Sequence, residues 1–185
     1  MTDEQARFDE RVRFEQARFD EQAGFGAAAG ELCTASAEET KRFGSVLAAA
    51  LRPGDLVALN GELGAGKTCL IQGIADGLGV NDVVNSPTFM LLNIFAGRDA
   101  AGGELNVYHF DLYRLASCDE LEDIGAVEFF HDPQGVSLVE WAERMPEMLP
   151  PARWEVQLEY GAGAGDRTIR WRRPATGKTH GRKTE

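Results

Sequence analysis

The feature that most constrains this chain is a run of glycines and a lysine placed between two regular segments. Residues Gly61 to Thr68 read Gly-Glu-Leu-Gly-Ala-Gly-Lys-Thr, which fits the spacing GxxxxGK[ST] at every fixed position. The apolar run 55–60 before it predicts a short buried strand. Residues 67–78 after it carry apolar side chains at helical spacing, with Gly79 as a helix stop. This order of strand, glycine turn and helix predicts an α/β architecture.

Such a turn is suited to holding phosphate groups. Glycines let the backbone curl so that successive N–H groups point inward, and the N-terminus of the following helix adds a positive dipole. The side chain of Lys67 is expected to reach the β and γ phosphates, and the hydroxyl of Thr68 to reach Mg²⁺. The sequence therefore predicts a P-loop that binds ATP or ADP with Mg²⁺, rather than a turn that binds nothing. Its predicted contact residues are Gly61, Glu62, Leu63, Gly64, Ala65, Gly66, Lys67, Thr68 and Cys69.

A P-loop ATPase also needs a carboxylate at the end of a neighbouring strand, and two acids qualify. Asp111 follows the strand-like run 107–110, and Glu140 follows the run 136–139. Either could hold or polarise the Mg²⁺ shell, and the residues alone do not decide between them. His109 is a weaker candidate for a catalytic base, because packing or a local hydrogen bond explains it equally well.

The remaining patterns place further elements along the chain. Ser36 with Glu39 predicts a helix N-terminus, and Pro53 marks where that helix has ended. Together with the P-loop unit these elements predict a three-layer P-loop NTPase-like domain around a mixed, partly parallel sheet. The expected segments are extended runs at 88–95 and 105–110, a helical stretch at 118–130, a strand at 136–139, and an antiparallel hairpin of 154–160 with 168–171.

Charge and composition divide the chain into three parts. Residues 1–31 form a charged extension with an eleven-residue repeat, interpreted either as a frayed or disordered segment or as a docking helix. Residues 32–173 form the predicted ATPase domain, after a glycine-rich linker at 24–30, and residues 174–185 form a basic tail.

The formal net charge of −11 makes the chain by itself a poor general binder of nucleic acid. With no apolar run long enough to span a bilayer, we expect no membrane partner and a cytoplasmic location. Cys33, Cys69 and Cys118 lack the spacing of a metal cluster and are interpreted as small buried hydrophobic residues.

Four segments of the chain form a recognisable set, in the order Gly61 to Thr68, Ser86-Pro-Thr-Phe89, Tyr108-His-Phe-Asp-Leu-Tyr-Arg-Leu115 and Leu138-Val-Glu-Trp-Ala-Glu143. They resemble the TsaE (YjeE) family of bacterial ATPases, which assist formation of threonylcarbamoyladenosine in tRNA. A P-loop alone would indicate only a superfamily, whereas Ser-Pro-Thr-Phe followed by His-Phe-Asp-Leu-Tyr-Arg is specific to this family. The resemblance extends from about Leu32 to Trp171.

The resemblance implies a role for each matched position. Lys67 and Thr68 would bind nucleotide and metal, Glu140 would reach Mg²⁺, and Asp111 would be required for hydrolysis. The loop that would sense the nucleotide comprises Ser86, Pro87, Thr88 and Phe89.

The resemblance also implies partners. A TsaD-type enzyme would transfer the threonylcarbamoyl group, helped by a TsaB-type companion, and tRNA would be held mainly by these partners. Two alternatives stay open: a small-molecule P-loop kinase, which would need an acceptor pocket and a lid with several arginines, and a nucleotide switch that does not hydrolyse ATP.

Overall fold

The computed structural model describes residues 28–123 and 125–174, so the eleven-residue repeat and most of the basic tail lie outside the described residues. Within these ranges no helix is long and apolar enough to cross a membrane. The strands are β1 (Ala29–Thr34), β2 (Leu56–Asn60), β3 (Leu92–Arg98), β4 (Glu104–Asp111), β5 (Gly135–Glu140), β6 (Trp154–Tyr160) and β7 (Arg167–Arg172). The helices are α2 (Ala37–Ala48), α3 (Lys67–Gly77), α4 (Cys118–Asp123) and α5 (Ala126–Phe130), with 3-10 turns at Ala142–Arg144 and Pro146–Met148.

All seven of these strands form one sheet, in the order β1-β7-β6-β2-β5-β4-β3. Strand β2 lies at its centre and runs parallel to both β5 and β6, and β4 runs parallel to β5. The outer pairs β3 with β4, β6 with β7, and β1 with β7 are antiparallel. The predicted mixed, partly parallel sheet is therefore confirmed, and the carboxyl ends of β2, β4 and β5 meet at one edge.

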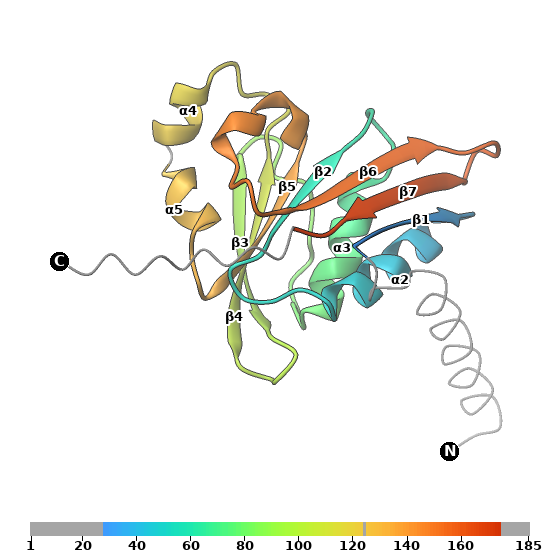
Figure 1. Ribbon diagram of the computed structural model, residues 1–185, viewed down its shortest axis with the longest axis horizontal. Helices are drawn as coiled ribbons and strands as arrows, with labels where there is room; N and C mark the ends of the chain where they lie inside the picture. Colours follow the sequence, from blue (N-terminus) through green and yellow to red (C-terminus); the bar gives the residue numbers. More distant parts are fainter. Residues whose placement is uncertain (1–27, 124, 175–185) are drawn as a thin grey trace.

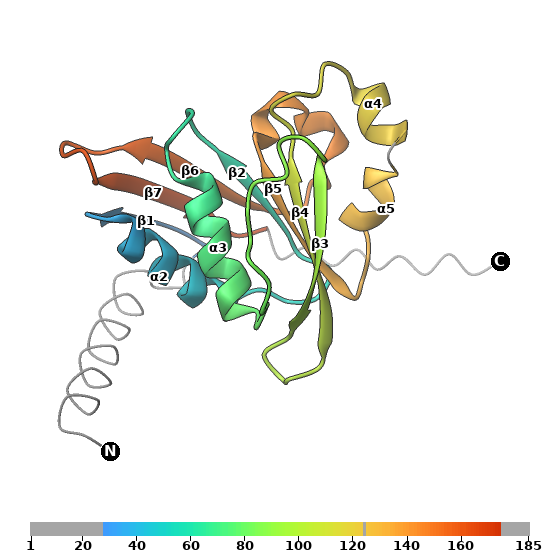
Figure 2. The same ribbon diagram turned by 180° about the vertical axis from the view of Figure 1, so that it is seen from behind.

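Helices cover both faces of the sheet, which gives the three layers (Figures 1 and 2). Helices α2 and α3 pack on one face, and α4, α5 and the 3-10 turns lie on the other. The side chains of β2 alternate between the two cores: Val57 and Leu59 belong to the α2/α3 core, whereas Leu56 and Ala58 belong to the other. A strand buried on both faces explains the unbroken apolar run that precedes the glycine loop.

The P-loop helix α3 is fixed in place by close contact with α2. Helix α2 begins as predicted, with the Ser36 hydroxyl accepting a hydrogen bond from the Glu39 N–H. Its backbone then lies so close to α3 that a Cβ at Gly73 would be 1.9 Å from the Lys41 carbonyl oxygen. Gly44 makes the reciprocal approach, since its Cβ would be 2.4 Å from the Leu70 carbonyl oxygen.

We expect Gly73→Ala to lower the free energy of unfolding by at least about 2 kcal/mol, because both helices must shift to admit the methyl group. Urea denaturation followed by circular dichroism measures this. Asp76→Ala, at an exposed position of the same helix, is the matched control and should change stability by less than about 0.5 kcal/mol. Equal stability of Gly73→Ala and the control would contradict this account of the α2/α3 contact.

The start of the sheet was predicted wrongly. Of the predicted linker 24–30, residues 24–27 lie outside the described part of the chain, but Ala29 and Gly30 already belong to β1, which pairs antiparallel with β7. Gly30 lies under the Trp171 ring, where a Cβ would come within 2.2 Å of the ring carbon Cζ2. A glycine at position 30 therefore leaves room for the ring of Trp171. The local sequence gives no indication of this contact, because Trp171 is distant along the chain.

Two other expected segments differ from the prediction, one being shifted and one divided. Residues 88–91 are not extended, because the Pro87 carbonyl accepts hydrogen bonds from the N–H groups of Met90 and Leu91 at 2.8 and 2.7 Å. The strand starts only at Leu92. The helical stretch 118–130 is two short helices, since Gly125 takes a left-handed conformation with φ of 69°.

The cysteines also differ from expectation. Cys33 is exposed, and Cys69 and Cys118 are partly exposed, so the interpretation of all three as buried hydrophobic residues is wrong. All three are free thiols. The Cys69 thiol donates to the Ala37 carbonyl at 3.1 Å, and its partial burial raises its pKa.

Candidate functional site

The glycine loop lies at the sheet edge where β2, β4 and β5 end. Its turns require left-handed backbone at three glycines, with φ of 140° at Gly61, 78° at Gly64 and 103° at Gly66. Gly66 is also the N-cap of α3, so the first turn of that helix opens onto the loop. A cavity of about 390 Å³ lies there, lined by loop residues, by residues of the 86–89 segment and by both candidate acids.

Lys67 is buried, with 4% of its surface exposed, and lies against the loop itself. Its Nζ donates to the carbonyl oxygens of Gly61 and Glu62 at 2.5 and 3.0 Å, and lies 3.6 Å from the centroid of the Trp141 ring. Burial lowers the pKa of Lys67, while the Glu140 carboxylate opposes this shift. No described residue forms an ion pair with it, so its contacts are dipoles and a ring face. Lys67 can exchange these contacts for phosphate oxygens without breaking a salt bridge.

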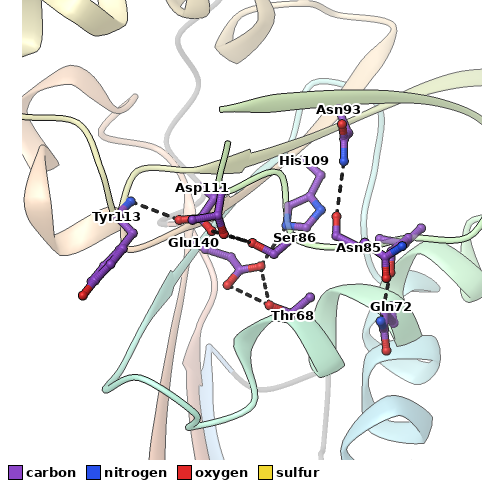
Figure 3. A network of polar contacts seen from close by, with 11 residues as sticks. Thr68, Gln72, Asn85, Ser86, Asn93, His109, Asp111, Tyr113 and Glu140 are labelled. Carbon is purple, nitrogen blue, oxygen red and sulfur yellow. Dashed lines mark hydrogen bonds and ion pairs between the residues drawn. The ribbon is translucent and has the colours of Figure 1, made fainter. Parts of the chain in front are cut away.

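Glu140 joins the P-loop helix to the sheet (Figure 3). The Thr68 hydroxyl is shared between both carboxylate oxygens of Glu140, at 2.8 and 3.0 Å. On the other side, His109 Nε2 lies 2.9 Å from Glu140 Oε1. Glu140 is 3% exposed, so it is nearly enclosed by these two partners. The residue predicted to bind metal and the residue predicted to supply a hydroxyl are thus direct neighbours.

His109 does not line the cavity and is fully buried. Its Nδ1 has no hydrogen-bond partner among the described residues. The tautomer with its proton on Nε2 fits this setting, because that N–H has the Glu140 carboxylate as acceptor whereas Nδ1 has no partner among these residues to receive a proton. His109 then donates to Glu140 and orients it. This placement matches the local hydrogen bond considered from the sequence and gives no support to the alternative of a catalytic base.

Asp111 connects the site to the segment 86–89 (Figure 3). Its Oδ2 accepts hydrogen bonds from the hydroxyls of Ser86 and Thr88 at 2.5 and 2.7 Å. Its Oδ1 accepts the N–H of Tyr113 at 3.0 Å. Beyond Thr88 the segment turns outward, and Phe89 is 84% exposed. Asp111 therefore fixes the base of a loop whose tip is exposed, where the centroid of the Phe89 ring lies 4.3 Å from Cζ of Arg114.

The two acids are level with each other in the sheet. Asp111 pairs with Glu140 in the β4/β5 register, and residues paired in this way lie on the same face. That face is the α3 side, because Leu105 and Val107 of β4, two-residue steps from Asp111, belong to the α2/α3 core. The sequence did not decide which of the two acids lies at the metal position. In the structure the two acids have different partners: Glu140 bonds Thr68, and Asp111 bonds Ser86 and Thr88.

The donor set fits a metal that is held jointly with a ligand. Among the described residues, no group of three or more His, Cys, Asp or Glu side chains could hold a metal ion without a ligand. Mg²⁺ usually binds one or two oxygen ligands from the protein and takes its other ligands from phosphates and water. The hydroxyl of Thr68 and the carboxylate of Glu140 match that requirement. These residues would hold the ion, which stays a prediction.

The sequence missed four residues near the loop. Tyr113 and Trp141 line the cavity and contact each other, with ring centroids 4.9 Å apart and ring planes tilted by 42°. Each follows a candidate acid closely, which is a signal that could have found them. Tyr160 and Arg167 touch the loop from the β6–β7 hairpin, about 100 residues along the chain, and no sequence signal indicates this.

Comparison with known proteins gives one consistent result. The family model described as "Threonylcarbamoyl adenosine biosynthesis protein TsaE" matches residues 34–169. A Bacillus subtilis protein named tRNA threonylcarbamoyladenosine biosynthesis protein TsaE is 44% identical over 136 residues, which are 74% of this chain and 80% of the relative. A Treponema pallidum protein of the same name is 45% identical over 134 residues, covering 72% of this chain and 93% of the relative.

A solved structure agrees with this. The crystal structure of Bacillus subtilis YdiB is similar with a TM-score of 0.63 and 35% identity, covering 80% of this chain and 86% of that one. The likeness supports the P-loop NTPase-like fold, and the family model spans every segment on which the resemblance was based. The chain belongs to the TsaE family.

Proposed function

We propose that this protein is the ATPase of tRNA threonylcarbamoyladenosine biosynthesis, binding ATP with Mg²⁺ through the loop Gly61–Thr68 and hydrolysing it to support threonylcarbamoyl transfer by a partner enzyme. The observation that carries the proposal is the convergence of Lys67, Thr68, Glu140 and Asp111 on one cavity at the loop. Family membership supports the pathway, and the cavity supports the chemistry.

Each residue has a stated task in this proposal. The loop N–H groups and Lys67 bind the phosphates, with Lys67 stabilising the charge that develops on the γ-phosphate. Thr68 and Glu140 hold Mg²⁺, which when bound neutralises phosphate charge. Asp111 holds the Ser86–Phe89 loop in place. Asp111 also orients the attacking water, either directly or through that loop. His109 orients Glu140.

The partners are also part of the proposal. A TsaD-type protein would perform the transfer with a TsaB-type companion, and tRNA would be held mainly by these proteins. The acidic charge of the chain supports this division, since a net charge of −11 repels a phosphate backbone. The cytoplasmic location stays a prediction.

We expect Asp111→Ala to lower partner-stimulated ATP hydrolysis by about 100-fold, because the loop bearing Ser86 and Thr88 loses its common acceptor. The assay measures phosphate release with Mg²⁺, with and without TsaB-type and TsaD-type partners and tRNA. Asp82→Ala, at an exposed position on the chain leading to this loop, is the matched control and should behave as wild type.

The same assay separates the alternatives. A kinase would transfer phosphate to an acceptor rather than release it, and a nucleotide switch would bind partners without turnover even when they are present. Hydrolysis that is indifferent to the partners and to Asp111→Ala would overturn the proposal.

A further inference from the structure

The β6–β7 hairpin holds the outer side of the glycine loop. Three consecutive loop carbonyl oxygens are each bonded by a hairpin side chain. The Tyr160 hydroxyl donates to the Leu63 carbonyl at 2.5 Å. The guanidinium of Arg167 donates from NH2 to the Gly64 carbonyl at 3.1 Å and from Nε to the Ala65 carbonyl at 3.0 Å.

Arg167 is itself held rigidly by the hairpin. Its NH1 donates to the carbonyl oxygens of Ala164 and Asp166 at 3.1 and 2.7 Å. Its Cζ lies 4.6 Å from the centroid of the Tyr160 ring. The guanidinium thus spans the hairpin turn and the glycine loop, and all four of these hydrogen bonds go to backbone carbonyl oxygens. Neither Arg167 nor Tyr160 lines the cavity, so they act on the loop from behind.

The direction of these carbonyl groups decides what the loop can bind. A peptide unit that points its C=O away from the cavity turns its N–H toward it, and such N–H groups form an anion-binding nest. In this loop the peptide units of Leu63 and Ala65 can do so with the N–H groups of Gly64 and Gly66, whereas the Ala65 N–H donates to the Glu62 carbonyl at 3.1 Å. A carbonyl turned inward would instead repel phosphate. Hydrogen bonds from a charged guanidinium are stronger than those between neutral groups, so Arg167 resists this rotation.

The first part of the loop is held by Lys67 and by the Ala65 N–H, which bond the carbonyl groups of Gly61 and Glu62, but the carbonyl groups of residues 63–65 are not bonded by either. Gly64 and Gly66 have no Cβ, so their backbone dihedral angles are less restricted than those of other residues. Leu63, between the strand and these glycines, is 72% exposed and gives the loop no packing. The hairpin side chains are therefore what holds the carbonyl groups of Leu63, Gly64 and Ala65 in their outward direction.

We propose that Tyr160 and Arg167 are positioning residues that fix the glycine loop in its phosphate-binding conformation before nucleotide arrives. The expected effect on nucleotide affinity rests on the proposed function. The expected effect on the loop conformation concerns the protein without nucleotide and does not rest on it. Bound phosphate would itself hold the N–H groups of the loop, so loss of the hairpin contacts should weaken binding and leave the rate of the bound complex nearly unchanged.

Arg167→Lys keeps the charge but loses the planar fork, and Tyr160→Phe keeps the ring but loses the hydroxyl. Arg170→Lys is the matched control, since Arg170 lies on the same strand and pairs with Glu31 and Glu159 without touching the loop. The readouts are amide hydrogen exchange of residues 62–68 without nucleotide, the Kd of MgADP, and KM against kcat for MgATP with the partner proteins. Thermal unfolding confirms that each variant is folded.

We expect exchange in the loop to accelerate and the Kd of MgADP to rise about tenfold in Arg167→Lys and about threefold in Tyr160→Phe, where tenfold corresponds to about 1.4 kcal/mol. KM should rise with Kd while kcat stays within about twofold. Loop exchange and affinity equal to wild type in both variants, or an equal change in Arg170→Lys, would overturn the inference. If the wild type itself bound no nucleotide, the proposed function would fail, and loop exchange alone would still decide whether the hairpin fixes the loop.

Discussion

Lys67→Ala is expected to raise the Kd for MgATP by at least about 100-fold and to abolish hydrolysis. Lys67 is the one cation among the described residues that lines the cavity, and each hydrogen bond from a charged group to phosphate contributes about 1.5–3 kcal/mol. Calorimetric titration with MgATP, or with a slowly hydrolysed analogue, measures the loss. Lys41→Ala is the matched control, because Lys41 is exposed on α2 and should leave affinity within about twofold.

The loss should not come from unfolding. Burial lowers the pKa of Lys67, which means that the folded protein holds this charge at a cost. Lys67→Ala removes this buried charge together with the Gly61 and Glu62 hydrogen bonds, so we expect the variant to remain folded without nucleotide, which thermal unfolding measures. Hydrolysis at the wild-type rate in Lys67→Ala would remove the basis for a nucleotide site at this loop.

Glu140→Gln should lower hydrolysis by about 100-fold and raise the Mg²⁺ concentration needed for half-maximal activity. Glutamine keeps the shape of the side chain and an acceptor for the Thr68 hydroxyl, but it removes the negative charge that a divalent cation requires. A Mg²⁺ titration of phosphate release at saturating ATP measures both effects.

The control for this change is Glu155→Gln. Glu155 lies on β6, which β2 separates from the strand of Glu140, and it pairs with Arg153 away from the loop. The Mg²⁺ dependence of Glu155→Gln should therefore match the wild type. An unchanged Mg²⁺ requirement in Glu140→Gln, even with slower turnover, would mean that the contact between Thr68 and Glu140 is structural and that the metal is held elsewhere.

The parts of the site that the sequence predicted are those that depend on local order. The glycine loop follows from its own spacing, and the strands before Asp111 and Glu140 follow from short apolar runs. Parallel strands bring their carboxyl ends to one edge of a sheet, so three correct strand ends were enough to place both acids beside the loop. The antiparallel pairing of β6 with β7 followed in the same way from two strand-like runs around a glycine-rich turn.

The parts that the sequence did not predict depend on distant partners. Residues 88–91 have the composition of an extended segment. The chain turns there instead because the Asp111 carboxylate accepts hydrogen bonds from the hydroxyls of Ser86 and Thr88. Strand β1 begins early because β7 offers it a pairing edge and Trp171 needs the space above Gly30. The contact of Arg167 with the loop joins positions about 100 residues apart. Such contacts exist only once the sheet has formed, so no window of sequence contains them.

The level pairing of Asp111 with Glu140 limits where the chain can change in length. Adding or deleting one residue within β4 or β5 would turn every following side chain to the opposite face and move one acid to the side away from α3. The turn between β3 and β4 lies at the other end of the hairpin, and nothing lies within 4 Å of a Cβ at Gly102. Natural insertions and deletions in this part of the molecule are therefore expected at residues 99–103 and not within the strands that end at the two acids.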